Sequence, residues 1–495
     1  MFIYIIFRAK DLNYILEVEG RMAELYKKDI LIVFQIVANM LRVFGYILLV
    51  PIIVSILLRE YRFTLIFFLM AIIITPSFSL IKRFLREQEC KMKHAIISLS
   101  IGWITISLIS SIPFILYGMG FIDSFFESFS GWTGTGLTMI KDPSLIPATL
   151  NFYRGFIQWV GGFGIVVLAL LLYERPSTAQ ALFLAEGRFE DFYFDFSKIA
   201  RMIVFIYTIY SGIGILAFTM AGVPFFDAVV HTMSTIATGG FSSNSVGIGI
   251  YGKLPMLIAV FLMYIGGISF LTHYKVIKGK ITNLFNNPEV RFIFLITIVA
   301  ITLVGLDLYK SHKSMYYEGF FYVVSALTGT GAGTLLPVDN FPSLSIFIFI
   351  LLMICGATYG STSGALKIWR IMIVIKSIKR EIVKHFYPRG TILHIKMGKH
   401  VISDEDSLRA ATYVFLYIAV IVMGSLVFVF AGYDVIKSIF LVSSAQGNVG
   451  LNIATENYFN MNPFLKLQLI LHMLLGRLEI IPFIVMLRSL LMVRR

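Results

Sequence analysis

Uninterrupted apolar runs of membrane-spanning length constrain the fold of this chain more than any other feature. Among them are the stretches 31–58, 62–80 and 462–491, and an α-helix needs about 20 apolar residues to cross a bilayer. Of the 495 residues, 58% are hydrophobic and 14% are charged, whereas soluble domains carry roughly 25% charged residues. The runs are continuous rather than alternating, which excludes a β-barrel. The sequence therefore predicts an all-α polytopic membrane protein and excludes a soluble enzyme.

The apolar runs follow a repeating order after a first pair of spans, which we expect at 31–58 and 62–81. Four units follow, each with a long helix, a short helix, a glycine-rich stretch and a second long helix. The long helices are expected in pairs, at 94–117 and 151–173, 199–221 and 254–277, 291–309 and 342–376, and 408–431 and 463–491. The short helices are expected at 123–132, 225–236, 316–327 and 434–445. Each short helix starts near an acidic residue, which suits a helix N-terminus.

This order divides the chain into successive segments. They are an N-terminal extension at 1–30, an extra transmembrane helix pair at 31–90, repeat 1 at 91–175, repeat 2 at 198–280, repeat 3 with an interrupted second long helix at 290–380, a basic loop at 381–407 and repeat 4 at 408–495. The net charge is +14, and Lys and Arg are densest between residues 367 and 399. The positive-inside rule then places both termini and this loop in the cytoplasm, and the glycine-rich stretches on the outer side.

The glycine-rich stretches carry the predicted chemistry. They read TGTGLT at 133–138, ATGGFS at 237–242, TGTGAG at 328–333 and GNVGLN at 447–452, which aligns Gly136, Gly240, Gly331 and Gly450. Glycine permits backbone conformations that turn carbonyl oxygens toward one axis, where they can replace the hydration shell of a small monovalent cation. The stretches contain no Lys, Arg or His, which favours a cation. The alternative is that these glycines serve only close helix packing, but four aligned positions argue against it.

Two features lie inside predicted spans. The sequence GATYGSTSG at 356–364 interrupts the span at 342–376, so its backbone must be satisfied by neighbours or water, and we expect it beneath the glycine loops. Arg477 lies about 21 Å along its helix from Pro463, at about 1.5 Å per residue, and an arginine at this depth is costly and by default functional. A packing kink and an inter-helix ion pair are the respective alternatives. Glu479 points to another side of the helix and is not the expected partner of Arg477.

These segments resemble the TrkH/KtrB type of potassium-uptake subunit, in the Trk/Ktr/HKT superfamily. The resemblance extends from about residue 31 to the end of the chain. It rests on DSFFESFS at 123–130, QWVGGFG at 158–164, STIATGGFS at 234–242, GSTSG at 360–364 with Lys367 and Arg370, and LGRLE at 475–479.

The resemblance implies potassium uptake across the cytoplasmic (inner) membrane of a bacterium or archaeon, with K+ as the transported ion, no organic cofactor and no catalytic residue. It implies a selectivity filter in which K+ binds at Thr135, Gly136, Gly239, Gly240, Thr330, Gly331, Val449 and Gly450. It implies a gate below the filter formed by Gly360, Ser361, Thr362, Ser363, Gly364, Lys367 and Arg477. In such a gate the loop obstructs the path, and the arginine repels the cation.

The resemblance also implies partners: a homodimer with one pore in each protomer, and a cytosolic nucleotide-binding regulatory ring of the TrkA/KtrA type. Basic residues on the predicted inner surface either attract lipid headgroups or dock this ring. They are Lys376, Lys379, Arg380, Lys384, Arg389, Lys396 and Lys399. Membrane lipids are expected contacts, and nucleic acid is not.

Other interpretations stay open at this stage. A sodium-permeable or sodium-coupled transporter is the first, because the third glycine loop is unusually rich in glycine. A rocking-type secondary transporter of a small solute is the second, but it would show inverted repeats, and these four units run in the same direction. His231, His273 and His312 lie near segment ends without metal-ligand spacing, so we interpret them as histidines of the polar surface.

Overall fold

The fold is described by a computed structural model. It covers residues 29–84, 90–164, 196–279, 282–388, 391, 393–398, 400–453 and 458–492. Within these ranges, six helices are long and apolar enough to cross a membrane, and two bent helix pairs would raise the number to eight. The predicted all-α membrane fold is confirmed. One addition is a small antiparallel hairpin of β1 (Ile395–Met397) and β2 (His400–Ile402) in the basic loop.

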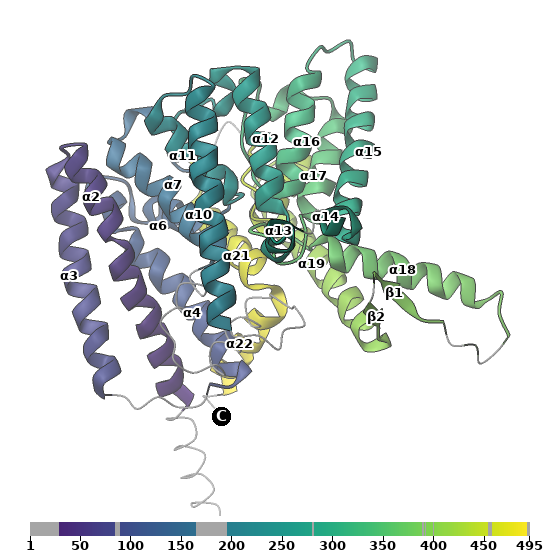
Figure 1. Ribbon diagram of the computed structural model, residues 1–495, viewed down its shortest axis with the longest axis horizontal. Helices are drawn as coiled ribbons and strands as arrows, with labels where there is room; N and C mark the ends of the chain where they lie inside the picture. The colour runs from purple at the N-terminus through teal and green to yellow at the C-terminus, as the bar shows by residue number, and fades with distance from the viewer. Residues whose placement is uncertain are drawn as a thin grey trace, which may run out of the picture.

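The extra helix pair stands at one edge of the molecule. Its first helix spans Asp29–Leu57 and ends in α2 (Leu49–Leu57), and its second is α3 (Tyr61–Phe84). The two form the purple hairpin at the left of Figure 1, and α2 packs against α7 (Ala148–Phe163) of the first repeat. Of the predicted N-terminal extension, residues 1–28 lie outside the described residues.

The four repeats follow in order along the chain. Repeat 1 consists of α4 (Met92–Ser110), α5 (Ile112–Tyr117), α6 (Phe121–Thr133), η1 (Pro143–Leu145) and α7. Repeat 2 consists of α10 (Phe196–Met220), α11 (Phe225–Ile236), η2 (Ile248–Tyr251), α12 (Lys253–Gly267) and α13 (Phe270–Ile277), and α14 (Thr282–Asn286) connects it to repeat 3. Repeat 3 consists of α15 (Pro288–Lys310), α16 (Tyr316–Thr328), η3 (Val338–Asn340), α17 (Ser343–Cys355) and α18 (Ile368–Lys384). Repeat 4 consists of α19 (Asp404–Phe430), α20 (Val435–Gln446), α21 (Pro463–Leu478) and α22 (Ile480–Met492).

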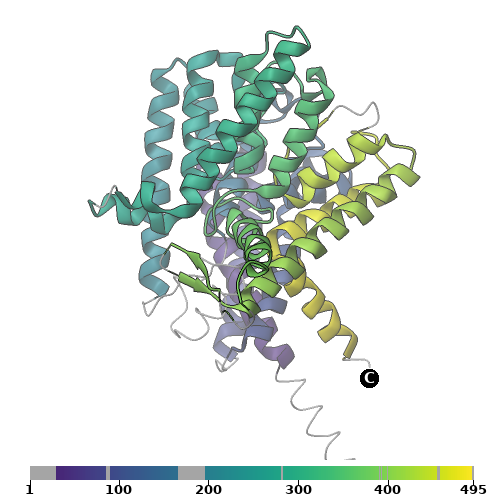
Figure 2. The ribbon, with the colours of Figure 1, turned by 90° about the vertical axis from the view of Figure 1, so that its right-hand side faces the viewer.

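The short helices α6, α11, α16 and α20 pack in a closed cycle. Each contacts the second long helix of its own repeat: α7, α12, α17 and α21, in that order. Each also contacts the second long helix of the repeat before it: α21, α7, α12 and α17. Repeat 4 therefore closes onto repeat 1, which is consistent with four similar units around one axis. The helix α18 and the β-hairpin project from this bundle (Figures 1 and 2).

The second long helices are more broken than the sequence predicts. Continuous spans at 254–277 and 463–491 are wrong, because α12 meets α13 at 100° and α21 meets α22 at 107°. The interruption predicted between 356 and 364 is present between α17 and α18. Helix α7 ends at Phe163, and residues 165–173 of its predicted span lie outside the described residues.

Close approach to the short helices accompanies these breaks. A Cβ atom added to Gly161, Gly266 or Gly476 would lie less than 3.0 Å from a backbone carbonyl oxygen near the end of a short helix. Those oxygens belong to Trp132, Ile236 and Gln446, respectively. Glycine is therefore required where α7, α12 and α21 each pass a short helix. Hydropathy does not register the bends, because the residues on both sides of them are apolar.

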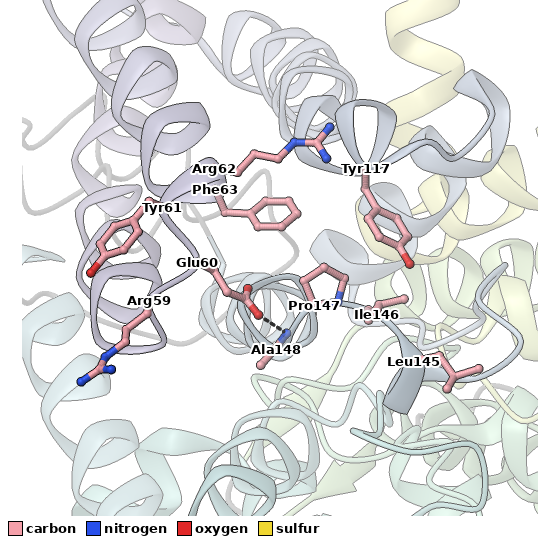
Figure 3. A pocket seen from close by; sticks show the side chains of 10 residues that line it. All are labelled: Arg59, Glu60, Tyr61, Arg62, Phe63, Tyr117, Leu145, Ile146, Pro147 and Ala148. Atoms are coloured by element: carbon pink, nitrogen blue, oxygen red, sulfur yellow. Dashed lines mark hydrogen bonds between the residues drawn. The ribbon is translucent and has the colours of Figure 1, made fainter.

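Glu60, in the turn between α2 and α3, joins the extra helix pair to repeat 1. Its carboxylate accepts hydrogen bonds of 3.0 Å from Ala148 N–H and from Thr149 N–H. These N–H groups belong to the first two residues of α7, whose own N-cap residue, Pro147, has no side-chain acceptor. A carboxylate satisfies such N–H groups and complements the helix dipole. Glu60 also borders an open surface pocket of about 740 Å³ (Figure 3), which none of the predicted filter or gate residues lines.

Glu60→Ala should destabilise the protein by about 1 kcal/mol, the usual effect of losing a helix cap. Ion preference should not change, because the cap lies away from the glycine loops. A thermal melt in detergent, with ion flux measured in parallel, checks both points. Tyr61→Phe is the control, because this side chain is 65% exposed and leaves the cap intact. Equal melting temperatures for the two variants would contradict the capping role.

Candidate functional site

The four glycine-rich stretches share one backbone conformation. At the second position of each, φ is positive: 70° at Gly134, 50° at Thr238, 74° at Gly329 and 51° at Asn448. At the fourth position φ is again positive: 87° at Gly136, 73° at Gly240, 69° at Gly331 and 94° at Gly450. The fourth position of each stretch is glycine. At the second position, Thr238 and Asn448 adopt a backbone conformation that residues other than glycine rarely adopt.

A serine of the short helix holds each loop from its N-terminal side. The backbone N–H of the residue before each aligned glycine donates to a serine carbonyl oxygen. These bonds are Thr135 to Ser130 at 2.9 Å, Gly239 to Ser234 at 2.8 Å, Thr330 to Ser325 at 2.9 Å and Val449 to Ser444 at 2.9 Å. Serine therefore stands six positions before the aligned glycine in all four repeats. This repeated serine was not among the predicted site residues, although it can be read directly from the aligned sequence.

The loops meet one another in chain order. A Cβ atom added to any of the four aligned glycines would lie less than 3.0 Å from a carbonyl oxygen of the next repeat. The pairs are Gly136 with Gly239, Gly240 with Thr330, Gly331 with Val449 and Gly450 with Thr135. The structure thus brings all eight predicted filter residues together in one ring, and the last repeat closes onto the first. A side chain at any of the four aligned positions would collide with backbone.

Two buried amides join glycine loops to neighbouring repeats. Gln158 of α7 donates to Gly239 O at 2.6 Å and accepts from Phe241 N–H at 3.0 Å. Asn448 Nδ2 donates to Thr135 Oγ1 at 3.0 Å. Each amide thereby ties the loop of one repeat to a neighbouring repeat. Gln158 belongs to the motif QWVGGFG at 158–164 but was not predicted as a site residue, because its contact with Gly239 spans 81 positions of the chain.

The predicted gate segment lies against this ring. Thr362 Oγ1 is 2.9 Å from Thr238 Oγ1 of repeat 2. A Cβ atom on Gly329 of repeat 3 would lie less than 3.0 Å from Ser363 Oγ, and one on Gly364 would lie equally close to the backbone of repeat 4, at Gly447 O. The segment therefore touches three of the four glycine loops.

Hydrogen bonds to broken helix α12 hold the segment in place. Thr358 N–H donates to Gly267 O at 3.1 Å, and Thr362 N–H donates to Gly266 O at 3.2 Å. The carbonyl groups freed at the end of α12 are therefore satisfied within the protein, as membrane depth requires.

Within the segment, the remaining predicted gate residues make local contacts. Gly360 has a φ of 76°, and Ser361 Oγ donates to Thr358 O at 2.6 Å. Lys367 Nζ donates to Ser363 O and lies 3.5 Å from Ser361 Oγ. Lys367, the residue before α18, is thereby bonded to the gate segment.

Arg477 joins α21 and α7 to the gate segment. From α21, its guanidinium donates to Thr362 O at 3.0 Å, to Gly161 O and to Gly162 O at 3.4 Å. The two glycine carbonyls belong to the last turn of α7, where a cation is favourable. Glu479 binds elsewhere: its two oxygens accept from Arg370 Nη2 at 2.6 and 2.8 Å.

The interpretation of His231 and His273 as surface histidines is wrong. Their side chains are only 4% and 6% exposed. His231 Nε2 lies 3.3 Å from Ser243 Oγ, and His273 Nε2 lies 2.9 Å from Ile265 O. His273 is turned inward by the bend between α12 and α13, which the sequence did not predict. His312, at the end of α15, is exposed as expected.

Comparisons with known proteins agree on one family. A family model described as TrkH, a cation transport protein, matches residues 64–492. The chain is 31% identical over 474 residues to an uncharacterized cation transporter of Methanocaldococcus jannaschii, covering 95% of this chain and 98% of that protein. It is 30% identical over 419 residues to the Trk system potassium uptake protein TrkH of Salmonella typhimurium, covering 80% and 86% of the two chains. The crystal structure of the potassium transporter TrkH from Vibrio parahaemolyticus matches with a TM-score of 0.83 at 26% identity, over 92% of this chain and 98% of that one.

Proposed function

Because the chain belongs to the TrkH family of cation transport proteins, we propose that it takes up potassium ions across the cytoplasmic membrane of a bacterium or archaeon. The observation that carries this proposal is the closed ring of four glycine loops, in which each aligned glycine abuts a carbonyl of the next repeat. The curated relative from Salmonella typhimurium is named as a potassium uptake protein. No covalent chemistry and no organic cofactor enter this function.

In this proposal the ring is the selectivity filter. K+ binds to backbone oxygens at the eight ring residues, which replace part of its hydration shell. The short helices support cation binding, because each runs into its loop with its C-terminal end, which carries a partial negative charge. The positive φ at every aligned glycine supports a backbone path that only glycine follows without strain.

The gate proposal assigns segment 360–364, Lys367 and Arg477 to the path below the filter. Its support is the contact of this segment with three glycine loops and the bond from Arg477 to Thr362 O. A fixed guanidinium charge next to the path raises the barrier for a cation. Opening then requires the segment to leave the ring and the arginine to release its carbonyl partners.

Ion uptake by cells that lack their own potassium transporters tests the main proposal. Expression of this chain should restore growth at low potassium and potassium accumulation, with sodium accumulated less. Sodium accumulation equal to that of potassium would favour the sodium-permeable alternative. Growth at low potassium no better than with empty vector, from a protein shown to be in the membrane, would contradict the proposal.

We further propose a homodimer and a cytosolic nucleotide-binding ring that docks on the basic surface around α18. Some basic residues on that surface already have partners within the chain. Arg380 is paired with Asp404, and Lys376 donates to Lys396 O at 2.5 Å. Lys379, Lys384 and Lys396 have exposed side chains and remain the candidates for a partner, although Lys384 Nζ lies 4.0 Å from Glu381 Oε2. Arg389 and Lys399 lie outside the described residues.

Neutralising two of these lysines, as Lys379→Gln with Lys384→Gln, should weaken ring binding and reduce the nucleotide response of ion flux. The reason is that α18 directly follows the gate segment, so a pull on this helix reaches the gate. A pull-down with the purified ring and a flux assay with added nucleotide check the two effects. Lys310→Gln, an exposed charge change at the far end of α15, is the control. Binding and response retained by the double variant would rule out docking at these lysines and leave lipid attraction.

A further inference from the structure

In three of the four repeats, a side chain of the short helix contacts the far side of the filter loop from the same position, and the residue type at this position differs among the repeats. This position lies nine residues before the aligned glycine. Its occupants are Glu127, His231, Tyr322 and Leu441. All four side chains are buried, with exposed fractions of 0%, 4%, 2% and 1%.

The polar occupants make one recurring contact. Each reaches the residue three positions after its aligned glycine. Glu127 Oε2 accepts from Met139 N–H at 2.8 Å, His231 Nε2 lies 3.3 Å from Ser243 Oγ, and the Tyr322 hydroxyl accepts from Thr334 N–H at 3.3 Å. Leucine at 441 has no polar group for this contact. In repeats 1 to 3 the filter residues are therefore held from both sides, by the serine carbonyl before them and by this side chain after them.

Repeat 1 extends the brace to its neighbour through Arg154, which is 1% exposed. Arg154 Nε donates to Glu127 Oε1 at 2.6 Å, and Nη2 donates to Thr138 Oγ1 at 3.1 Å. Nη1 donates across the repeat boundary to Ser242 O at 3.1 Å. The guanidinium also lies over the Phe241 ring, 4.3 Å from its centre. This buried network ties the loops of repeats 1 and 2 together.

We propose that Glu127, His231 and Tyr322 are positioning residues that determine ion discrimination by fixing three of the four filter loops. The proposal rests on the filter proposed above. A fully satisfied buried network rigidifies the groups it joins, so it keeps the carbonyl oxygens at the spacing that suits the larger ion. When a brace is lost, the loop can close around a smaller cation, and sodium competes better.

Tyr322→Phe is the sharpest test, because it removes one oxygen and keeps the ring. The variant loses both the bond from Thr334 N–H and the bond of 2.7 Å that the hydroxyl donates to Leu336 O. The potassium-to-sodium flux ratio in proteoliposomes should fall about three- to ten-fold, the scale of one to two net hydrogen bonds. Glu127→Gln should lower the ratio as well, because the neutral amide weakens the bonds from Arg154 and Met139. The matched control is Tyr317→Phe on the same helix, which loses a hydroxyl bond to Lys253 O away from the loop and should keep the wild-type ratio.

Flux ratios of Tyr322→Phe and Gly240→Ser distinguish failure of this inference from failure of the proposed filter. A wild-type flux ratio in folded Tyr322→Phe protein would overturn the inference, even if the melting temperature fell, because that result shows support of the fold alone. If Glu127→Gln does not fold, Tyr322→Phe still decides. If Gly240→Ser also leaves the ratio unchanged, the proposed filter fails. If Gly240→Ser destroys the ratio and Tyr322→Phe does not, only the brace fails.

Discussion

Gly240→Ser is expected to reduce the preference for potassium over sodium about ten-fold or more, while the protein still folds and inserts. A Cβ atom at Gly240 would lie less than 3.0 Å from Thr330 O and from the carbonyl carbon of Gly331, so the loops of repeats 2 and 3 must separate. A change of only about 1.4 kcal/mol in the relative binding of two ions gives a ten-fold effect. Flux of each ion into liposomes, normalised to folded protein, measures it.

Gly222→Ser provides the matched control for this variant. Gly222 also has a positive φ, 88°, but a Cβ atom there has no neighbour within 4 Å. Both serine variants therefore carry backbone strain, and only Gly240→Ser crowds the ring. If serine at all four aligned glycines left ion preference unchanged, the ring of carbonyls would not be the filter.

Shortening segment 360–364 is expected to raise potassium flux, and Arg477→Ala should raise it too. Two unit charges about 4 Å apart interact by about 4 kcal/mol at an effective dielectric near 20. Removing even a third of that barrier would increase flux about ten-fold. Arg477→Ala also removes the guanidinium donor from the carbonyls of Thr362, Gly161 and Gly162, of which Gly161 O keeps a bond of 3.0 Å from Gly164 N–H. A buried acceptor without a partner costs about 1–3 kcal/mol, so a lower melting temperature should accompany the higher flux.

Arg477→Lys distinguishes the effect of the positive charge from the effect of the guanidinium hydrogen bonds. Lysine keeps the positive charge but lacks the planar fork that reaches α7 and the gate segment together. If the charge obstructs the path, ion flux through Arg477→Lys should stay close to the wild-type flux. If the hydrogen bonds of the guanidinium to α7 and the gate segment keep the path closed, flux through Arg477→Lys should rise as far as it does in Arg477→Ala. Flux normalised to folded protein decides. Lower flux together with a lower melting temperature in Arg477→Ala would show a structural arginine and contradict the gate.

Local signals in the sequence predicted the pore elements well. Residues 225–236 were predicted as a short helix and are α11 in the structure, because an acidic first turn and a glycine stop are encoded within a dozen residues. The interruption after Cys355 was predicted for the same reason, since a run of glycine, serine and threonine disfavours a helix.

Contacts between distant segments could not be predicted in the same way. The bend at Glu479 is invisible to hydropathy, because apolar residues flank it on both sides. The bond from Gln158 to Gly239 and the bond from Arg477 to Gly161 depend on which helices become neighbours, which no local pattern encodes. The brace at Glu127, His231 and Tyr322 was hidden for another reason: three different residue types perform one task, so no motif repeats.

Closure of repeat 4 onto repeat 1 has a consequence for synthesis of the protein. Asn448 and Thr135, which bond across this junction, are 313 residues apart in the chain. At about 5–20 residues per second, the ribosome makes the later partner about 15–60 seconds after the earlier one. During that interval the nascent first repeat exposes Thr135 and the flank of α6 to lipid or to the insertion machinery. Truncation before α20 therefore leaves an open ring with unmatched polar groups, which quality-control proteases can recognise.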